Sequence, residues 1–312
     1  MTITVTAWLA MATGIGLDRF SLPLAQTTSD ADAAMTLFQA IVIGIVQGLT
    51  EFLPISSTAH VKMIPVALGW GDPGVAFTAV IQLGSIAAIL WYFWDDLRQV
   101  TVGMVQATLE RKFDAPDFRL GLGILLGTLP IVVMGLLIKL LIPDFDNSPL
   151  RSSGTIAVVS IVMALLLAVA ELIGRRQRTF DQLTLRDGVL MGLAQALALI
   201  PGVSRSGSTL TAGLFMGLER STAARFSFLL GVPAITLAGL VELKGLIENG
   251  LDTVGLVPLI GGLLAAVVSS YLAIFWLLRF LKQHSTWVFV WYRLAFGAAI
   301  LLALATGRLS NP

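Results

Sequence analysis

The stretch QGLTEFLPISSTAH at residues 47–60 places an acid, an imidazole and several hydroxyls inside otherwise apolar sequence, and PGVSRSGST at residues 201–209 does the same with an arginine. Ionisable groups inside a bilayer are costly and persist mainly where they function. Pro54 and the pair Pro201 and Gly202 cannot continue a helix, and irregular backbone at membrane depth needs protein or water to satisfy it. Each stretch therefore predicts a re-entrant helix-loop-helix hairpin.

Composition places the chain in a membrane. Of its 312 residues, 56% are hydrophobic and 12% are charged, and the mean hydropathy is +0.87. A soluble domain has about a quarter of its residues charged. The net charge of +1 gives no general field that would attract nucleic acid, so no nucleic-acid partner is expected. The absence of cysteine excludes disulfides, thiolate metal sites and a cysteine nucleophile.

The first 35 residues differ in kind from the rest. They resemble a signal peptide, but their start carries no Lys or Arg, and Pro23 occupies the minus-three position of the candidate cleavage site. We therefore expect residues 1–35 to form a loosely attached or surface-lying extension rather than a cleaved signal. Residues 36–312 are expected to form a single integral membrane domain.

Six uninterrupted apolar segments are long enough to span a bilayer in a window of about 19 residues. They lie at about 75–94, 120–142, 153–173, 222–243, 254–278 and 287–306. Basic residues gather in the loops at 95–119 and 174–186 and, as Arg279 and Lys282, after the fifth span. All of these loops fall on one side if the spans alternate, and the positive-inside rule makes that side cytoplasmic.

The resulting order is hairpin, three spans, hairpin, three spans, which divides into halves at about 37–173 and 187–308. Short matches recur at an offset of 147 residues: Pro54-x-x-Ser57 with Pro201-x-x-Ser204, and Leu83-Gly84 with Leu230-Gly231. An odd number of spans per half inverts the second half. We predict an all-α polytopic membrane protein with an inverted-topology repeat, whose hairpin tips meet near the midplane.

The first polar stretch carries groups suited to phosphate chemistry. Gln47 and Glu51 lie one helical turn apart, and so do Ser57 and His60 after the proline break. Glu51 is predicted to bind a divalent cation or to act as a general base, His60 to transfer protons, and Ser57 to be a nucleophile or a phosphate contact. Mg²⁺ is usually held by such oxygen ligands with water and substrate phosphates, and Ca²⁺ would use similar groups.

The second polar stretch is suited to gripping phosphate. Arg205 is flanked by Ser204 and Ser206 and is followed by Gly207 and Thr209. A planar guanidinium offers paired donors to a phosphate, and a glycine lets backbone N–H groups approach an anion closely. These serines, Arg205 and Thr209 are therefore candidate phosphate-binding residues.

Simpler explanations compete for some of these residues. Glu51 and Arg205 could form a structural ion pair, which would not exclude a role in binding. Ser56 and Thr58 are explained more simply as helix caps or interhelical hydrogen-bonding groups. A capping Ser56 would also leave free N–H groups pointing into the loop, which is an anion site, so both remain candidate phosphate-binding residues.

The motifs resemble one family, the bacterial undecaprenyl-diphosphate phosphatases that confer bacitracin resistance. The stretches similar to this family are EFLPISSTAH at 51–60, VIQLGS at 80–85, PGVSRSG at 201–207 and FSFLLGVP at 226–233, and the match covers about 37–308. The resemblance implies hydrolysis of a C55 polyprenyl diphosphate to the monophosphate and inorganic phosphate with a divalent cation, which recycles the lipid carrier for cell-wall synthesis. It also implies paired re-entrant hairpins in an inverted repeat.

The resemblance further implies a multi-pass protein of the bacterial inner membrane whose site faces the periplasm. Its partners would be the polyprenyl diphosphate and membrane lipid, and a homodimer is compatible with the sequence. By position, Glu51 becomes the essential acid. The remaining functional groups carried over are the hydroxyl of Ser57, the imidazole of His60, and the phosphate-binding Ser204, Arg205 and Thr209.

Two positions depart from the family pattern. This chain has Gln47 where the family often has Glu, and Ala59 where it often has Gly. An amide cannot act as a base and is a weaker metal ligand, so Glu51 is expected to hold the cation with substrate oxygens and waters. Attack by Ser57 and attack by an activated water both remain open. The rival function is a polyprenyl-phosphate transporter or flippase, since inverted repeats that meet at a midplane site also occur in transporters.

Overall fold

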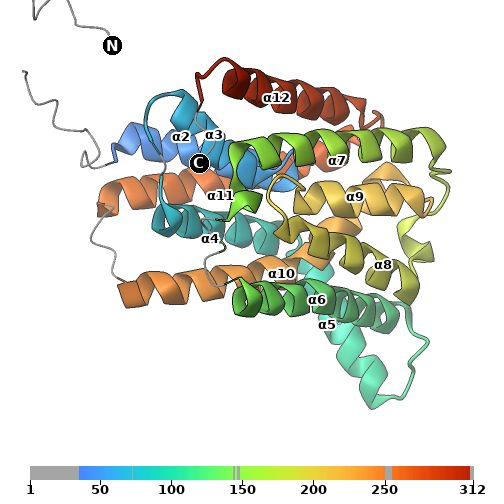
Figure 1. The fold of residues 1–312 in the computed structure, drawn as a ribbon. Helices are drawn as coiled ribbons and strands as arrows, with labels where there is room; N and C mark the ends of the chain where they lie inside the picture. The colour runs from blue at the N-terminus through green and yellow to red at the C-terminus, as the bar shows by residue number, and fades with distance from the viewer. Residues whose placement is uncertain (1–34, 72, 143–144, 146–147, 250–254, 310–312) are drawn as a thin grey trace, which may run out of the picture. The chain divides into compact units, whose positions relative to one another are not determined.

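A computed structural model describes residues 35–71, 73–142, 145, 148–249 and 255–309. The expected extension at 1–35 lies outside this part of the chain except for its last residue. Within the described residues the regular structure is helical, with no β-strand, which confirms the all-α prediction. Figure 1 shows the helices and their order.

The long helices run in chain order as α2 (Leu37–Phe52), α3 (Ser57–Ala67), α4 (Val75–Tyr92), α5 (Trp94–Leu109), α6 (Pro116–Leu141), α7 (Ser153–Ile173), α8 (Leu185–Ala196), α9 (Arg205–Phe215), α10 (Arg220–Asn249), α11 (Leu256–Phe280) and α12 (Trp287–Ala305). Short 3₁₀ turns are η3 (Pro149–Arg151), η4 (Phe180–Gln182) and η5 (Leu197–Leu199). Among the described residues, five helices are long and apolar enough to cross a membrane, and the pair α4 and α5 would make a sixth. The chain is a multi-pass membrane protein.

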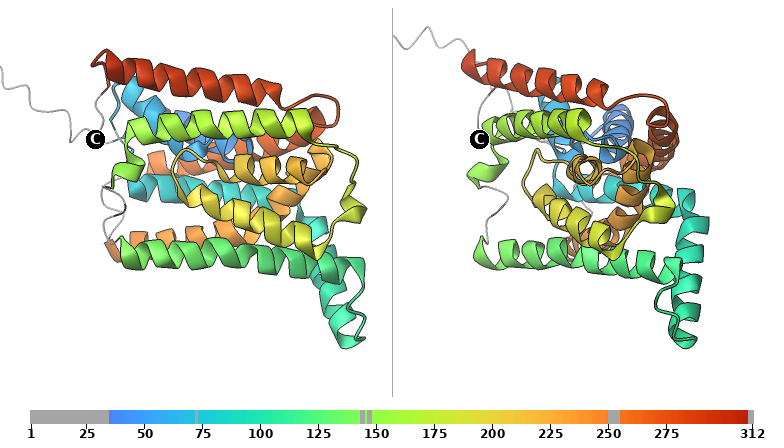
Figure 2. Two further views of the ribbon diagram at one scale, coloured as in Figure 1. Left: turned by 45° about the vertical axis from the view of Figure 1, so that its right-hand side comes forward. Right: turned by 90° about the vertical axis from the view of Figure 1, so that its right-hand side faces the viewer.

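The segment 95–119 was expected to be a loop, but most of it forms α5. This helix bends by 69° from α4 at Phe93 and projects from the other helices (Figures 1 and 2). Asp95 and Asp96 lie in its first turn, where carboxylates favour a helix N-terminus. The loop prediction was wrong here because charge was taken as a sign of irregular structure.

Both polar stretches break a helix at the expected places. The first hairpin is α2 and α3, and the second is α8 and α9 with η5 between them; the two enter from opposite ends of the helices in Figure 1. Each second helix begins after a serine with a left-handed backbone, Ser56 at φ 77° and Ser204 at φ 73°. That conformation costs a residue with a Cβ about 1–2 kcal/mol. Strain of this kind concentrates at functional sites.

Close helix crossings hold the hairpins in place. The first helix of each hairpin packs along a long helix, α2 on α11 and α8 on α6. A Cβ at Gly44 would lie 2.2 Å from the carbonyl oxygen of Gly262, and one at Gly192 would lie 2.1 Å from that of Gly127. Small residues at such crossings let two backbones approach closely within a membrane.

Apolar residues beside the first break anchor it in the core. Phe52 and Ile55 are buried in the largest apolar cluster, where Phe52 makes an edge-to-face contact with Phe228 of α10 at 5.4 Å. The outer face of α6 instead exposes a row of residues, each at least 51% accessible: Leu125, Leu129, Val133, Leu136 and Leu140. Such a face suits lipid. The core therefore sits behind the hairpins and leaves the outer helix faces for the bilayer.

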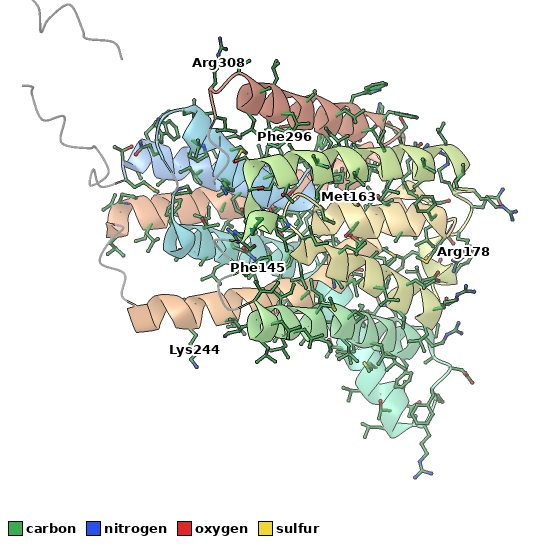
Figure 3. All side chains as sticks on the ribbon, in the orientation of Figure 1. Phe145, Met163, Arg178, Lys244, Phe296 and Arg308 are labelled. Carbon is green, nitrogen blue, oxygen red and sulfur yellow. The ribbon has the colours of Figure 1, made fainter. Side chains whose placement is uncertain are left out.

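Basic residues lie at both ends of the helices among those labelled in Figure 3. Arg178 lies at the end where α7 meets α8, and Lys244 and Arg308 lie at the other end (Figure 3). Each half consists of one hairpin followed by three candidate spans when α4 and α5 are counted together. The inverted relation between the halves, and the cytoplasmic assignment of the basic loops, stay predictions.

Candidate active site

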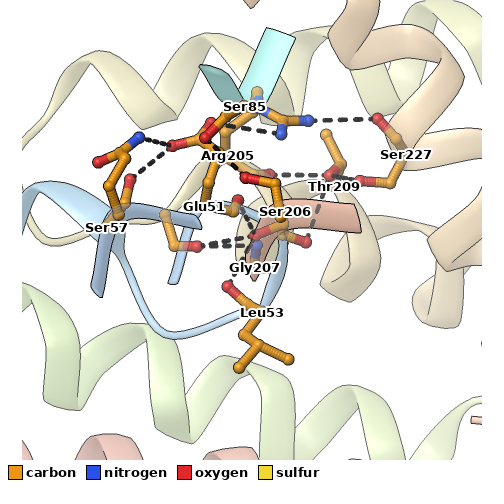
Figure 4. A network of polar contacts seen from close by, with 12 residues as sticks. Glu51, Leu53, Ser57, Ser85, Arg205, Ser206, Gly207, Thr209 and Ser227 are labelled. Atoms are coloured by element: carbon orange, nitrogen blue, oxygen red, sulfur yellow. Dashed lines mark hydrogen bonds and ion pairs between the residues drawn. The ribbon is translucent and has the colours of Figure 1, made fainter. Parts of the chain in front are cut away.

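The breaks of the two hairpins meet each other. The hydroxyl of Ser206 in α9 donates to the carbonyl of Leu53 at 3.0 Å, and Arg205 Nη2 lies 3.5 Å from Glu51 Oε1 (Figure 4). Residues about 150 positions apart in the sequence therefore share one site, as the predicted hairpins required.

Glu51 is the centre of the polar network. Its Oε2 accepts hydrogen bonds from Ser57 Oγ at 2.7 Å and from Gln47 Nε2 at 3.2 Å, while Oε1 faces Arg205. A hydroxyl that donates to a carboxylate at this distance has its proton directed at a base. The arrangement therefore pairs a candidate nucleophile with a candidate proton acceptor.

Arg205 is buried and holds unused donors. Its side chain is only 10% exposed, its Nη1 makes a long 3.4 Å hydrogen bond to the Ser227 carbonyl, its Nη2 has only the 3.5 Å ion pair with Glu51, and its Nε has no hydrogen-bond partner among the described residues. Buried polar groups are nearly always satisfied, so unpaired guanidinium donors point to an anionic ligand. Gly231 faces the guanidinium: a Cβ there would lie 2.1 Å from Nη1, so any side chain would displace it.

A cavity of about 160 Å³ opens between the breaks. Its polar side is formed by Glu51, Ser56, Ser57, Thr58, Gln82, Gly202, Ser204 and Arg205. Its apolar side is formed by Ile131, Ala198, Ala234, Ile235 and Ala238 from the η5 region, α6 and α10. A site lined by both charged and apolar residues fits an amphiphile that carries an anionic head.

The predicted phosphate-binding residues of the second stretch separate into two groups. Ser204 lines the cavity and caps α9 by accepting from the Gly207 N–H at 3.1 Å. Ser206 and Thr209 are not among the lining residues. Ser206 ties α9 to the first hairpin, and Thr209 donates to the Arg205 carbonyl at 2.8 Å and bonds the Ser227 hydroxyl. Their contacts position Arg205 and the two breaks.

His60 is likewise not among the residues that line the cavity. It is 1% exposed, with Nδ1 2.7 Å from the Ser56 carbonyl, Nε2 2.7 Å from the Tyr292 hydroxyl, and its ring stacked on Phe296. A carbonyl can only accept, so Nδ1 carries a proton, and in the neutral ring Nε2 accepts from Tyr292. His60 is therefore connected to the cavity only through its hydrogen bond to Ser56, which lines it.

Comparison with known proteins identifies the family. Residues 40–299 match the family model described as bacitracin resistance protein BacA. The chain belongs to the BacA family. An undecaprenyl-diphosphatase of Trichormus variabilis is 67% identical over 277 residues, which are 89% of this chain and 87% of that protein. Similar proteins with the same name are 64% identical in Synechocystis, over 88% of this chain and 84% of the relative, and 64% identical in Synechococcus elongatus, over 91% and 98%.

For the cation expected in a BacA-family enzyme, the cavity offers one carboxylate as a ligand. Glu51 is the sole acidic residue that lines the cavity in the described part of the chain, where no group of three His, Cys, Asp or Glu residues comes together. Gln47 is 2% exposed, and its amide N–H donates a hydrogen bond to Glu51. The residues fit an ion that takes most of its ligands from substrate phosphate and water, which is how Mg²⁺ is commonly held.

Sequence reasoning missed Arg293 in this BacA-family chain. The residue lies in α12, is 1% exposed, and donates to the carbonyls of Pro54, Gly202 and Val203 and, more weakly, to that of Ser160. The sequence did contain a sign of this residue's importance, because burying an arginine inside the apolar span 287–306 costs free energy and such residues usually have a function. What the sequence does not reveal is that its partners are the two hairpin breaks.

Proposed function

We propose that this chain is an undecaprenyl-diphosphate phosphatase, which hydrolyses the C55 polyprenyl diphosphate to the monophosphate and inorganic phosphate. This activity recycles the lipid carrier for cell-wall synthesis and gives bacitracin resistance. Membership of the BacA family and the similarity to undecaprenyl-diphosphatases support the assignment. The structural observation that carries it is the Glu51–Ser57 pair facing the unsatisfied donors of Arg205 across one cavity.

The diphosphate would bind at the polar wall of the cavity. The free donors of Arg205 suit the oxygens of the terminal phosphate, because charge-assisted hydrogen bonds are about twice as strong as neutral ones. The N-terminal turns of α3 and α9 begin at the cavity, and helix N-termini favour anions. Hydroxyls of Ser56, Thr58 and Ser204 add further donors.

The Ser57–Glu51 hydrogen bond favours Ser57 as the nucleophile. In this route Oγ attacks the terminal phosphorus as its proton moves to Glu51, and the bond to the bridging oxygen breaks, which releases undecaprenyl phosphate. Water then hydrolyses the phosphoserine and yields inorganic phosphate. In the direct route Glu51 takes a proton from a water that attacks the same phosphorus. Trapping radiolabelled phosphate on Ser57 distinguishes the two.

Arg205 would stabilise charge on the transferred phosphoryl group, where most of the catalytic gain in phosphoryl transfer arises. A divalent cation, Mg²⁺ or Ca²⁺, held by Glu51 and substrate oxygens would neutralise further phosphate charge. His60 has both ring nitrogens engaged, so we assign it to holding the start of α3 rather than to contact with substrate. The polyprenyl tail would leave along the apolar wall, between helices, into lipid.

We place the site in the periplasmic half of the bacterial inner membrane. Cavity residues Gln82 of α4, Ile131 of α6 and Ala238 of α10 each lie in the part of the helix farther from the basic loops. If those loops are cytoplasmic, the cavity faces the opposite leaflet. The substrate and surrounding lipid are then the partners of this surface.

Phosphate release from a C55 diphosphate by the purified protein tests the proposal. Arg205→Met should lower turnover by about 100-fold or more, as loss of one preorganised charge-stabilising donor does. Arg308→Met, an exposed arginine near the chain end, is the matched control and should retain turnover. Wild-type turnover in Arg205→Met would refute the assignment. Lipid movement across vesicles without phosphate release would favour the transporter alternative.

A further inference from the structure

Arg293 is the one charged residue of α12 within its span, and it joins both hairpins to the helices behind them. Its Nη1 lies 3.1 Å from the carbonyls of both Pro54 and Val203, and its Nη2 lies 2.7 Å from that of Gly202. Its Nε points at the Ser160 carbonyl of α7 at 3.3 Å, and α12 lies along α7 (Figures 1 and 2). One guanidinium therefore bonds the breaks of two hairpins.

In the part of the chain that the structure describes, this guanidinium has no anionic partner. Among the described residues no carboxylate forms an ion pair with Arg293 within 4.0 Å, and each of its hydrogen-bond acceptors is a backbone carbonyl. Burying a charge costs free energy unless the charge is paired, and hydrogen bonds to four neutral carbonyls offset only part of that desolvation cost. A helix tie alone could be made by a neutral side chain. The retained positive charge therefore points to an anion nearby.

The cavity adjoins the carbonyl partners of Arg293 and could hold that anion. Gly202, whose carbonyl accepts from Arg293, itself lines the cavity, and Ser204 and Ser56 follow its other partners within two residues. A Cβ on Gly207, in the first turn of α9, would lie 2.8 Å from Arg293 Nη1. The charge thus sits directly behind the wall that would hold the diphosphate.

The residue before Arg293 reinforces the same connection. The Tyr292 hydroxyl bonds His60 Nε2, and His60 Nδ1 bonds the Ser56 carbonyl. Two consecutive residues of α12 therefore hold the first hairpin at two points, and Arg293 adds the second hairpin. Because Glu51 and Ser57 flank the first break and Arg205 follows the second, the distance between these groups depends on this connection.

We infer that Arg293 is a positioning residue of the phosphatase site, which fixes the two hairpin breaks relative to each other and supplies a permanent positive charge behind the substrate diphosphate. The inference rests on the proposed function for the identity of the anion. Lysine has a single charged centre and lacks the planar fork, so it would keep the charge but lose most of the carbonyl bonds. Replacement by lysine therefore separates the contribution of the charge from that of the carbonyl hydrogen bonds.

The experiment compares Arg293→Met, which keeps length but removes charge, with Arg293→Lys. The readouts are kcat and KM for C55 diphosphate, affinity for non-hydrolysable methylene diphosphonate, and thermal unfolding in detergent. Arg293→Met should lose about 100-fold in kcat, a typical effect of misplaced catalytic groups, and should bind the diphosphonate more weakly. Arg293→Lys should keep diphosphonate affinity within about threefold yet still lose kcat, because the geometry relaxes.

Arg220→Met is the matched control, because Arg220 is also an arginine bonded to a neighbouring helix, through Glu171 of α7. It should lower the unfolding temperature and leave kcat, KM and diphosphonate affinity unchanged. Folded Arg293→Met with wild-type kcat and affinity would overturn the inference. If that variant does not fold, Arg293→Lys decides: full kcat in the folded protein overturns the positioning role. Absence of phosphate release by the wild type would refute the proposed function instead, and diphosphonate binding would still test Arg293.

Discussion

Ser57 Oγ lies 2.7 Å from Glu51 Oε2, and the two residues stand on opposite sides of the break in the first hairpin. Six residues apart, they would not share a face of a continuous helix. They meet because α2 ends at Phe52 and the chain turns through Pro54 before α3 begins. The proline break therefore creates the pairing of a hydroxyl with a carboxylate on which the proposed chemistry depends.

If Glu51 activates Ser57, the two residues act as a unit. Ser57→Ala and Glu51→Gln should each lower kcat by about 10²–10⁴-fold, the usual contribution of a general base or its partner. The double variant should be no slower than the slower single variant, because units of this kind are strongly non-additive. Steady-state phosphate release measures this. Multiplicative losses in the double variant would show that the two residues act independently.

Gln47→Glu should strengthen the binding of a divalent cation. A second carboxylate one turn from Glu51 would add a hard oxygen ligand where the amide now donates a hydrogen bond at 3.2 Å. We expect the half-saturating Mg²⁺ or Ca²⁺ concentration to fall by about tenfold, in the range that single ligand-shell changes produce. Gln47→Met, with no oxygen at this position, is the control. An unchanged cation requirement in both variants would show that the ion does not bind near Glu51.

Tyr292→Phe should lower kcat several-fold while leaving the pH profile of kcat/KM unaltered. The substitution keeps the stacked ring but removes the hydroxyl that bonds His60 Nε2. His60→Gln should have a larger effect on kcat and likewise preserve the shape of the profile, because both ring nitrogens are engaged with Ser56 and Tyr292 and we propose that the imidazole holds the start of α3. If His60 were instead the proton-transfer group, its replacement would abolish one limb of the profile.

Gly192→Ala should destabilise the protein by about 1–3 kcal/mol, the usual cost of overpacking. A Cβ there would lie 2.1 Å from the Gly127 carbonyl oxygen, where backbone meets backbone and neither can move aside cheaply. Gly135→Ala in α6 is the control, since its nearest neighbour would be 3.9 Å away, and removing a helix glycine should be neutral or stabilising by up to about 1 kcal/mol. Unfolding in detergent measures both. Equal stability of the two variants would contradict the close crossing of α8 and α6.

Much of the fold could be read from the sequence because its signals are local. Apolar length predicts a spanning helix, and Pro54 and Pro201, each set among polar residues, mark the two helix breaks. Helix α5 was missed, because charged residues such as Asp95, Asp96 and Arg98 after the span at 75–94 were taken as a sign of a loop. The role of Arg293 was missed for a different reason: its partners are backbone carbonyls, which every residue carries and no motif reveals.

The sequence by itself determined the membrane class, the two helix breaks and the groups available for phosphate chemistry, since composition and proline act locally. Tertiary structure decided which of those groups meet. It brings Glu51, Ser57 and Arg205 to one cavity, turns His60 toward Tyr292, and gives Ser206 and Thr209 hydrogen bonds to backbone carbonyls outside the cavity lining. These outcomes depend on helix crossings that only small residues such as Gly44 and Gly192 permit. The distances between side chains follow from how closely those helices pack, and sequence spacing does not encode them.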